Sequence, residues 1–245
     1  MYRKKMVIAF VGAGGKTSTM YRLADKYAAR GKKVIVTTST HILKDENFIE
    51  IERAGELAHA GKELFASRPF LSVGKDEGRK IGSLAGEEID RLRDYADIVL
   101  VEADGAKRLP LKLPREGEPQ IPDSCNLVFV CAGLDCIGET LESCCLRYEY
   151  AKDLFGWEPQ HRVSEEDLAA LLCDERGGLK CVGEREIVFL LNKADHPRRL
   201  ESAYRVRSCI IRCMKEKEIK NKYKICITSN RYPGKRFVKG GGSDV

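Results

Sequence analysis

The most informative stretch of this 245-residue chain reads Lys5-Met6-Val7-Ile8-Ala9-Phe10-Val11-Gly12-Ala13-Gly14-Gly15-Lys16-Thr17-Ser18. An apolar run leads into a glycine-rich turn and then into Lys-Thr-Ser. Glycines allow a tight turn, and consecutive N–H groups of such a turn can surround anionic oxygens. The positive N-terminal end of a following helix adds to this attraction. The stretch predicts a strand, a loop and a helix that together hold the phosphates of a nucleotide.

Individual residues of this loop have distinct expected roles. The Lys16 ammonium would reach the β- and γ-phosphates, and the Thr17 hydroxyl would bind Mg²⁺. The common pattern G-x-x-x-x-G-K-S/T would place its first glycine at Phe10, so this chain departs from it there. A glycine-rich turn without a ligand is the alternative, but helical spacing after Lys16 and the helix-ending Gly31 favour a nucleotide. The residues expected to hold it are Gly12, Ala13, Gly14, Gly15, Lys16, Thr17 and Ser18.

Short apolar runs alternate with helical patterns along the rest of the chain. Strands are predicted at 34–36, 70–74, 98–101, 127–130, 187–191 and 225–227, and helices at 50–67, 86–95, 138–155 and 200–217. This alternation predicts an α/β fold with a mostly parallel sheet and helices on both faces. Together with the phosphate loop, it indicates a P-loop NTPase-like fold. We expect a single domain over residues 1–231 and a flexible tail over 232–245.

Two carboxylates, Glu102 and Asp104, follow the buried strand that ends at Val101. Alternation places both on one side of an extended chain, where they are costly unless a cation or a water uses them. We expect one to hold the Mg²⁺ of a nucleotide and the other to orient the attacking water, with Gly105 close to the γ-phosphate. A strand end that is acidic by chance is the alternative.

Hydroxyl side chains end the second predicted strand, from Thr37 to Thr40. In nucleotide hydrolases this neighbourhood often supplies a hydroxyl to Mg²⁺, and Thr38 is the residue expected to do so here. Plain β-propensity and turn chemistry explain these residues almost as well. The expected metal ligands are Thr17, Thr38, Glu102 and Asp104, and the expected catalytic residues are Lys16, Glu102 and Asp104.

A second motif, Asn192-Lys193-Ala194-Asp195, directly follows the strand predicted at 187–191. It matches N-K-x-D, the guanine-reading pattern of GTPases. Asp195 can accept from guanine N1–H and the 2-amino group together, a charge-assisted contact that adenine cannot make. The stem of Lys193 can cover the base, and Asn192 can tie this loop to the phosphate loop. The motif therefore favours GTP over ATP, and Thr228-Ser229-Asn230 could line the base from another side.

Composition and charge exclude several classes of protein. Contents of 43% apolar and 33% charged residues are typical of a globular protein, and no apolar run is long enough to span a membrane. Residues 196–245 carry 14 Lys and Arg against 4 Asp and Glu, but no aromatic-interleaved nucleic-acid motif accompanies this charge. The ten cysteines form no C-x-x-C pair and are expected to be reduced in the cytosol, with Cys144-Cys145 the best candidate for a soft-ligand or reactive pair.

Three cations follow the acidic pair in a proline-rich loop, namely Lys107, Arg108 and Lys112. They could contact phosphate, a substrate or a partner protein, or they could be solvated loop charges. The four histidines show no metal-ligand spacing, so none is given a role.

These segments together resemble the YqeC family over about residues 5–210. The resembling stretches are Val11-Gly12-Ala13-Gly14-Gly15-Lys16-Thr17, Val36-Thr37-Thr38, Val101-Glu102-Ala103-Asp104-Gly105-Ala106 with the proline-rich residues after it, Ala132-Gly133-Leu134-Asp135, residues 166–180 and Leu191-Asn192-Lys193-Ala194-Asp195. A His-Arg-Pro-Glu-like segment of the family falls where this chain has Leu146-Arg147-Tyr148-Glu149. The role of that histidine therefore does not carry over, whereas Arg147 and Glu149 remain possible matches.

The YqeC family is described as accessory proteins for selenium-dependent molybdenum hydroxylases. The site is also similar to that of GTPases that load metals into hydrogenase and urease, which have Glu-x-x-Gly where this chain has Glu102-Ala103-Asp104-Gly105. The resemblance implies a magnesium-dependent, slow, cytoplasmic GTPase-like maturation factor. Its expected partners are a nucleoside triphosphate and a client molybdenum hydroxylase or cofactor-carrying protein, and neither nucleic acid nor a membrane is expected.

Two alternatives remain open on the sequence. A small-molecule kinase would use ATP on the same phosphate loop, and Glu102 or Asp104 would then activate a substrate hydroxyl. A non-catalytic scaffold would bind nucleotide and dock through the basic C-terminal helix.

Overall fold

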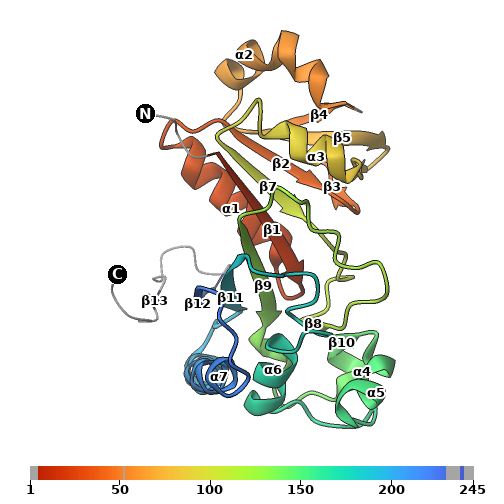
Figure 1. Ribbon diagram of the computed structural model, residues 1–245, viewed down its shortest axis with the longest axis vertical. Coiled ribbons are helices and arrows are strands. Elements are labelled where there is room, and N and C mark those ends of the chain that lie inside the picture. Colours follow the sequence, from red (N-terminus) through yellow and green to blue (C-terminus); the bar gives the residue numbers. More distant parts are fainter. Residues whose placement is uncertain (1–4, 52, 230–237, 240–245) are drawn as a thin grey trace. The chain divides into compact units, whose positions relative to one another are not determined.

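The computed structural model describes residues 5–51, 53–229 and 238–239 (Figure 1). The chain forms two compact units, each assembled from separate segments. The first unit comprises Met1–Phe10, Thr17–Gly105 and Gln120–Val128, and the second comprises Val11–Lys16, Ala106–Pro119 and Phe129–Val245. The single domain expected over 1–231 stays a prediction, and most of the predicted tail lies outside the described residues.

The first unit is built on parallel strands whose hydrophobic runs are buried. Its strand order is β1-β7-β2-β5-β6-β3, and β4 pairs with β5. The strands are β1 (Met6–Gly12, whose last two residues belong to the second unit), β2 (Val34–Thr38), β3 (Ile42–Leu43), β4 (Phe48–Glu50), β5 (Leu71–Glu77), β6 (Lys80–Gly82) and β7 (Ile98–Glu102). The β1–β7, β7–β2 and β2–β5 pairs are parallel, and β6 pairs antiparallel with β5 and β3. The helical segments are α1 (Lys16–Ala28), η1 (Ala54–Glu56), α2 (Leu57–Ser67) and α3 (Gly86–Leu92).

The second unit has the strand order β13-β12-β11-β9. These strands are β9 (Leu127–Gly133, whose first two residues belong to the first unit), β11 (Glu186–Asn192), β12 (Tyr223–Ile227) and β13 (Val238–Lys239), and β11 pairs parallel with β12. A separate parallel pair joins β8 (Leu111–Lys112) to β10 (Cys145–Leu146). The helical segments are η2 (Leu134–Cys136), α4 (Leu141–Cys144), η3 (Tyr148–Tyr150), α5 (Ala151–Phe155), α6 (Glu165–Leu172) and α7 (Pro197–Glu216).

The fold class expected from the sequence is confirmed: the protein is α/β, with mostly parallel strands flanked by helices. Helix α6 begins at a capping box, in which the Ser164 side chain accepts from the Asp167 N–H. Residues 138–155 were expected to be largely helical, and they form three short helical segments interrupted by a strand. The chain there forms α4, β10, η3 and α5, because Cys145 leaves the helix to pair with Leu111 and Arg147 adopts a left-handed backbone.

Candidate functional site

The loop between β1 and α1 is held in the second unit by the end of β9. The Ala13 N–H donates to the Cys131 carbonyl at 2.9 Å. A Cβ at Gly12 would lie 2.4 Å from that same carbonyl oxygen, and a Cβ at Gly14 would lie 2.1 Å from the Gly133 nitrogen. Both glycines also have positive φ, at 87° and 76°. The loop therefore needs glycine because its backbone passes against another backbone, a requirement separate from phosphate binding.

Two hydrogen-bond donors of this loop, the Gly14 N–H and the Lys16 ammonium, already bond to backbone carbonyls of the protein. The Gly14 N–H donates to the Leu109 carbonyl at 3.1 Å, and the Lys16 ammonium donates to the Gly12 carbonyl at 2.5 Å. The sequence predicted that the N–H groups would point toward a ligand, whereas the N–H groups of Ala13 and Gly14 point to carbonyls of neighbouring segments. A phosphate that uses the Gly14 N–H has to replace the Leu109 oxygen.

Asn192, at the end of β11, joins three segments of the second unit. Its Nδ2 donates to the Gly14 carbonyl at 2.8 Å, and its Oδ1 accepts from the Thr228 hydroxyl at 3.0 Å. The residue is 1% exposed, so these contacts give hydrogen-bond partners to a buried amide. The contact between the Asn192 loop and the phosphate loop is the one expected from the N-K-x-D motif.

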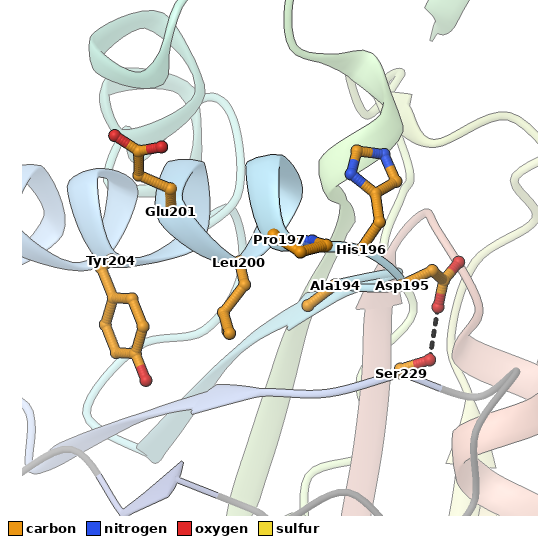
Figure 2. A pocket seen from close by; sticks show the side chains of 8 residues that line it. All are labelled: Ala194, Asp195, His196, Pro197, Leu200, Glu201, Tyr204 and Ser229. Atoms are coloured by element: carbon orange, nitrogen blue, oxygen red, sulfur yellow. Dashed lines mark hydrogen bonds between the residues drawn. The ribbon is translucent and has the colours of Figure 1, made fainter.

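Asp195 lines a pocket of about 420 Å³ (Figure 2). The Ser229 hydroxyl donates to Asp195 Oδ1, and the Arg199 guanidinium lies 3.8 Å from Oδ2. The pocket is lined by Ala194, Asp195, His196, Pro197, Leu200, Glu201, Tyr204 and Ser229. Ser229 was only a weak candidate in the sequence, and Asn230 lies outside the described residues. The structure thus gives Asp195 a partner that holds its carboxylate in one orientation.

Lys193 points to an acidic partner that the sequence did not predict. Its ammonium lies 2.7 Å from Oδ2 of Asp135, which is in η2, and its backbone is left-handed with φ of 65°. Lys193 was expected to cover a bound base, and this role stays a prediction. Asp135 lies in the Ala132-Gly133-Leu134-Asp135 segment that resembles the YqeC family, which was the available signal for it.

In the first unit, the predicted metal ligands Thr17 and Glu102 lie together. The Thr17 hydroxyl donates to Glu102 Oε2 at 2.5 Å, and Glu102 is only 6% exposed. A hydroxyl beside a carboxylate is an oxygen donor set that suits Mg²⁺, which keeps its other positions for phosphate oxygens and waters. These two side chains therefore fit the ion that the sequence predicts.

The other two predicted metal ligands, Thr38 and Asp104, are also buried. The Thr38 hydroxyl donates to the Glu102 backbone carbonyl at 3.0 Å and accepts from the Thr40 N–H at 2.9 Å. Asp104 is 2% exposed, and the Ala103 N–H before it donates to the Phe10 carbonyl. In the described residues no group of three or more His, Cys, Asp or Glu side chains is arranged to hold a metal ion by itself.

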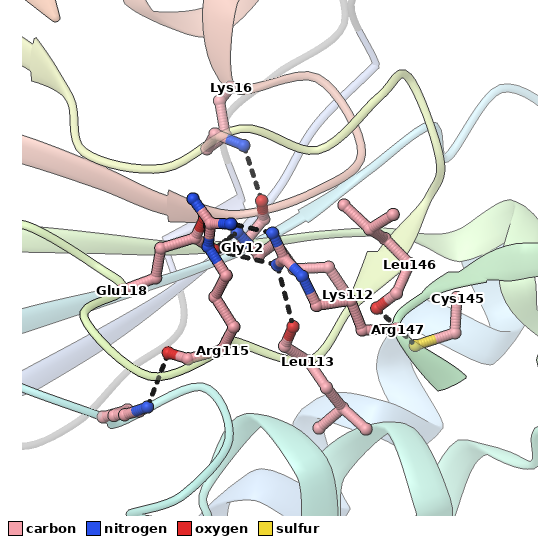
Figure 3. Close-up of polar contacts among 10 residues, drawn as sticks. Gly12, Lys16, Lys112, Leu113, Arg115, Glu118, Cys145, Leu146 and Arg147 are labelled. Atoms are coloured by element: carbon pink, nitrogen blue, oxygen red, sulfur yellow. Dashed lines mark hydrogen bonds and ion pairs between the residues drawn. The ribbon is translucent and has the colours of Figure 1, made fainter. Parts of the chain in front are cut away.

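A buried ionic cluster in the second unit was not predicted from the sequence (Figure 3). Glu118 accepts from Lys112 at 2.7 Å and from both terminal nitrogens of Arg147 at 2.9 and 3.1 Å, and Arg115 Nε lies 3.0 Å away. Burial alone would raise the pKa of Glu118, but the hydrogen bonds and charges of Lys112 and Arg147 bring it below its ordinary value. Lys112, considered above as a phosphate contact, thus bonds to the Glu118 carboxylate.

The adjacent cysteines Cys144 and Cys145 are buried free thiols, as is Cys136. Burial raises the pKa of the Cys144 thiol to about 11, and it also raises those of Cys136 and Cys145. Thiols with raised pKa values are poor nucleophiles at neutral pH, so burial favours buried cysteines that pack as small apolar side chains over a reactive pair.

Comparisons with known proteins agree with the resemblance. Residues 8–149 match the family described as "YqeC protein". The chain is 33% identical over 196 residues to the "Uncharacterized protein YqeC" of Escherichia coli (strain K12), an alignment that covers 77% of this chain and 76% of that protein. No helix in the described part of the chain is both long and apolar enough to cross a membrane. The match over more than half of the sequence and the shared identity show that the chain belongs to the YqeC family.

Proposed function

We propose that this protein is a magnesium-dependent nucleotide hydrolase that prefers GTP and serves as a maturation factor for a selenium-dependent molybdenum hydroxylase. The observation that carries the nucleotide part is the double contact of Asn192, which joins the phosphate loop at Gly14 to the end of β12 at Thr228. This contact brings the candidate base-reading loop onto the candidate phosphate loop within one unit. The client rests on the resemblance to the YqeC family.

The preference for guanine rests on Asp195. The Ser229 hydroxyl at Oδ1 and the Arg199 guanidinium, 3.8 Å from Oδ2, orient its carboxylate, and we propose that the carboxylate accepts from a base in this orientation. Guanine offers N1–H and a 2-amino group to a carboxylate, whereas adenine presents an acceptor at N1 and lacks the amino group. A charge-assisted pair to guanine is thus possible and the same contact to adenine is repulsive.

The residues expected to act on the phosphates come from two short segments, Lys16-Thr17 and residues 102–105. Lys16 supplies an ammonium to the β- and γ-phosphates, and Thr17 with Glu102 holds Mg²⁺. When bound, Mg²⁺ neutralises charge on the phosphate oxygens. Asp104 and Gly105 follow Glu102, and we propose that Asp104 orients the attacking water and that the Gly105 N–H contacts the γ-phosphate.

Equilibrium binding of fluorescent GTP and ATP in the presence of Mg²⁺ tests this proposal. Wild type, Lys16→Ala and Asp195→Ala are compared with Asp153→Ala, which removes an exposed carboxylate of α5. We expect GTP preference in wild type and Asp153→Ala, no preference in Asp195→Ala, and weak binding of both nucleotides in Lys16→Ala. Equal affinity for ATP that is unaffected at Asp195 would contradict guanine reading and favour the kinase interpretation.

A further inference from the structure

A basic turn in the second unit has no assigned role. The Leu109 N–H donates to the Ala106 carbonyl at 3.0 Å, which closes a turn that presents Lys107 and Arg108. Both residues are exposed, and both have left-handed backbones, with φ of 46° and 65°. Residues other than glycine seldom adopt this region, and two in succession are rarer still. Such backbone strain is retained where a turn has to present particular side chains.

The turn is attached directly to the phosphate loop. The carbonyl of Leu109, the residue after Arg108, accepts the Gly14 N–H at 3.1 Å, and the next carbonyl, of Pro110, accepts the Gly133 N–H at 2.8 Å. The Cα of Arg108 lies about 3.8 Å from that of Leu109 across one peptide bond. Arg108 is therefore next in sequence to the residue whose carbonyl bonds to the phosphate loop. On the loop side, Lys16 lies two residues after Gly14.

The charges of this turn are not used by the protein. In the described part of the chain, neither Lys107 nor Arg108 makes a side-chain hydrogen bond or an ion pair. Arg115 and Arg147 of the same unit differ, because both contact Glu118. A cationic side chain next to a phosphate loop, whose N–H groups make no bond within the described part of the protein, is suited to bind an anionic ligand of that loop.

We propose that Arg108 is a catalytic residue, whose guanidinium contacts the γ-phosphoryl oxygens in the transition state of GTP hydrolysis; this role rests on the proposed function. In that step the water oxygen forms a bond to the γ-phosphorus, and the bond from this phosphorus to the β–γ bridging oxygen breaks. The bridging oxygen keeps the electron pair and leaves with GDP, and the water proton ends on inorganic phosphate. The guanidinium stabilises the negative charge that moves onto these oxygens.

Arg108 is assigned this role in preference to Lys107 for two reasons. Arg108 is the residue directly before the Leu109 carbonyl that contacts the phosphate loop. Its planar fork can also bond two phosphoryl oxygens together, which a lysine ammonium does as a point charge only. Lys107 has the same charge, exposure and backbone region, so its variant is a matched control.

The test compares Arg108→Asn and Lys107→Asn in the full chain, because asparagine removes the cation and tolerates a left-handed backbone. Single-turnover GTP hydrolysis, GTP affinity and the affinity for GDP with aluminium fluoride are measured with Mg²⁺. We expect Arg108→Asn to lower the hydrolysis rate about 100-fold and to abolish the tightening by aluminium fluoride, with GTP affinity within about threefold of wild type. Lys107→Asn should resemble wild type in all three measurements.

Two results would overturn the role of Arg108 and leave the proposed function intact. These are an equal single-turnover rate for wild type and Arg108→Asn, or a loss of GTP affinity with an unchanged rate at saturating GTP, since the latter is loss of uniform binding and not of transition-state stabilisation. Wild type that binds GTP but neither hydrolyses it nor binds GDP more tightly with aluminium fluoride would overturn both this role and the hydrolase part of the proposed function. Absence of any nucleotide binding by folded wild type would reject the proposed function as well.

Discussion

The side-chain amide of Asn192 donates to the backbone carbonyl of Gly14 over 2.8 Å, although 178 residues separate them in the chain. The same amide accepts the Thr228 hydroxyl, so one buried side chain connects the loops after three strands. A strand-end asparagine thus acts as a structural link as well as a part of the proposed base site.

Replacing Asn192 with Ala should therefore affect stability and nucleotide binding together. The change leaves the Gly14 carbonyl and Thr228 hydroxyl without the bonds that Asn192 makes, which costs about 1–3 kcal/mol in the free energy of unfolding. Urea unfolding and GTP titration measure the two effects. Asn221→Ala is the control, because Asn221 also donates to two carbonyls, of Gly183 and Arg185. It should lose stability but keep GTP affinity, and equal affinity in both variants would contradict the link.

The two reasons for glycine at position 14 can be separated by comparing two substitutions. Gly14→Ala meets the Gly133 backbone and also has a φ of 76°, whereas Gly117→Ala has a similar φ of 72° with open space around the new Cβ. The left-handed backbone alone costs about 1–2 kcal/mol, and the clash adds roughly 1–3 kcal/mol at Gly14 only. Thermal unfolding of the two variants should show this difference. Equal losses would mean that the β9 backbone moves aside.

The Glu118 cluster predicts a stability difference that depends on pH. Glu118→Gln removes the carboxylate from Lys112 and Arg147 and should cost about 3 kcal/mol near pH 7, as breaking a buried ion pair does. Because the folded-state pKa of Glu118 is lowered below 4.5, its contribution is complete above that value and is lost as the pH falls through the folded pKa.

Urea unfolding of wild type and Glu118→Gln at pH 7 and at pH 3 checks this prediction. The gap between the two proteins should be smaller at the lower pH. Glu149→Gln, at an exposed position of η3, should stay within about 0.5 kcal/mol of wild type at both pH values. A gap for Glu118→Gln that does not change with pH would argue against a contribution from its ionised form.

Thr17→Val should distinguish the contribution of Mg²⁺ to GTP affinity from that of the phosphate contacts. The variant keeps the shape of the side chain but loses the hydroxyl that lies 2.5 Å from Glu102. Loss of a direct ligand should reduce the gain in GTP affinity on adding Mg²⁺ by at least about tenfold, the cost of losing a supporting partner. Titrations with and without EDTA measure this gain, and Ser67→Ala on α2 is the control. An unchanged Mg²⁺ dependence would remove Thr17 from the metal site.

The elements that the sequence predicted well are those encoded locally. The strand, glycine loop and helix from Met6 to Ala28 and the motif after β11 each lie in one short segment, where periodicity and residue type suffice. The meeting of Thr17 and Glu102 was also accessible, because parallel strands bring their carboxyl ends to one edge.

The features that the sequence did not reveal depend on contacts between distant polar residues. Glu118 and Arg147 are 29 positions apart, and the sequence around each residue does not indicate that the other is its partner. The strand that interrupts the helical segments of 138–155 has a similar cause, since the apolar spacing there is helical but Cys145 gains strand pairing with Leu111. Tertiary contacts outweigh the local preference there.

The chain passes between its two compact units five times, after residues 10, 16, 105, 119 and 128. No single cut can release either unit as a continuous fragment, so truncation cannot assign an activity to one of them. The same threading affects synthesis on the ribosome, where the phosphate loop emerges early and its Asn192 partner late. At 5–20 residues per second, the 178 residues between them take roughly 10–35 s to make, and during that time the loop waits without this support.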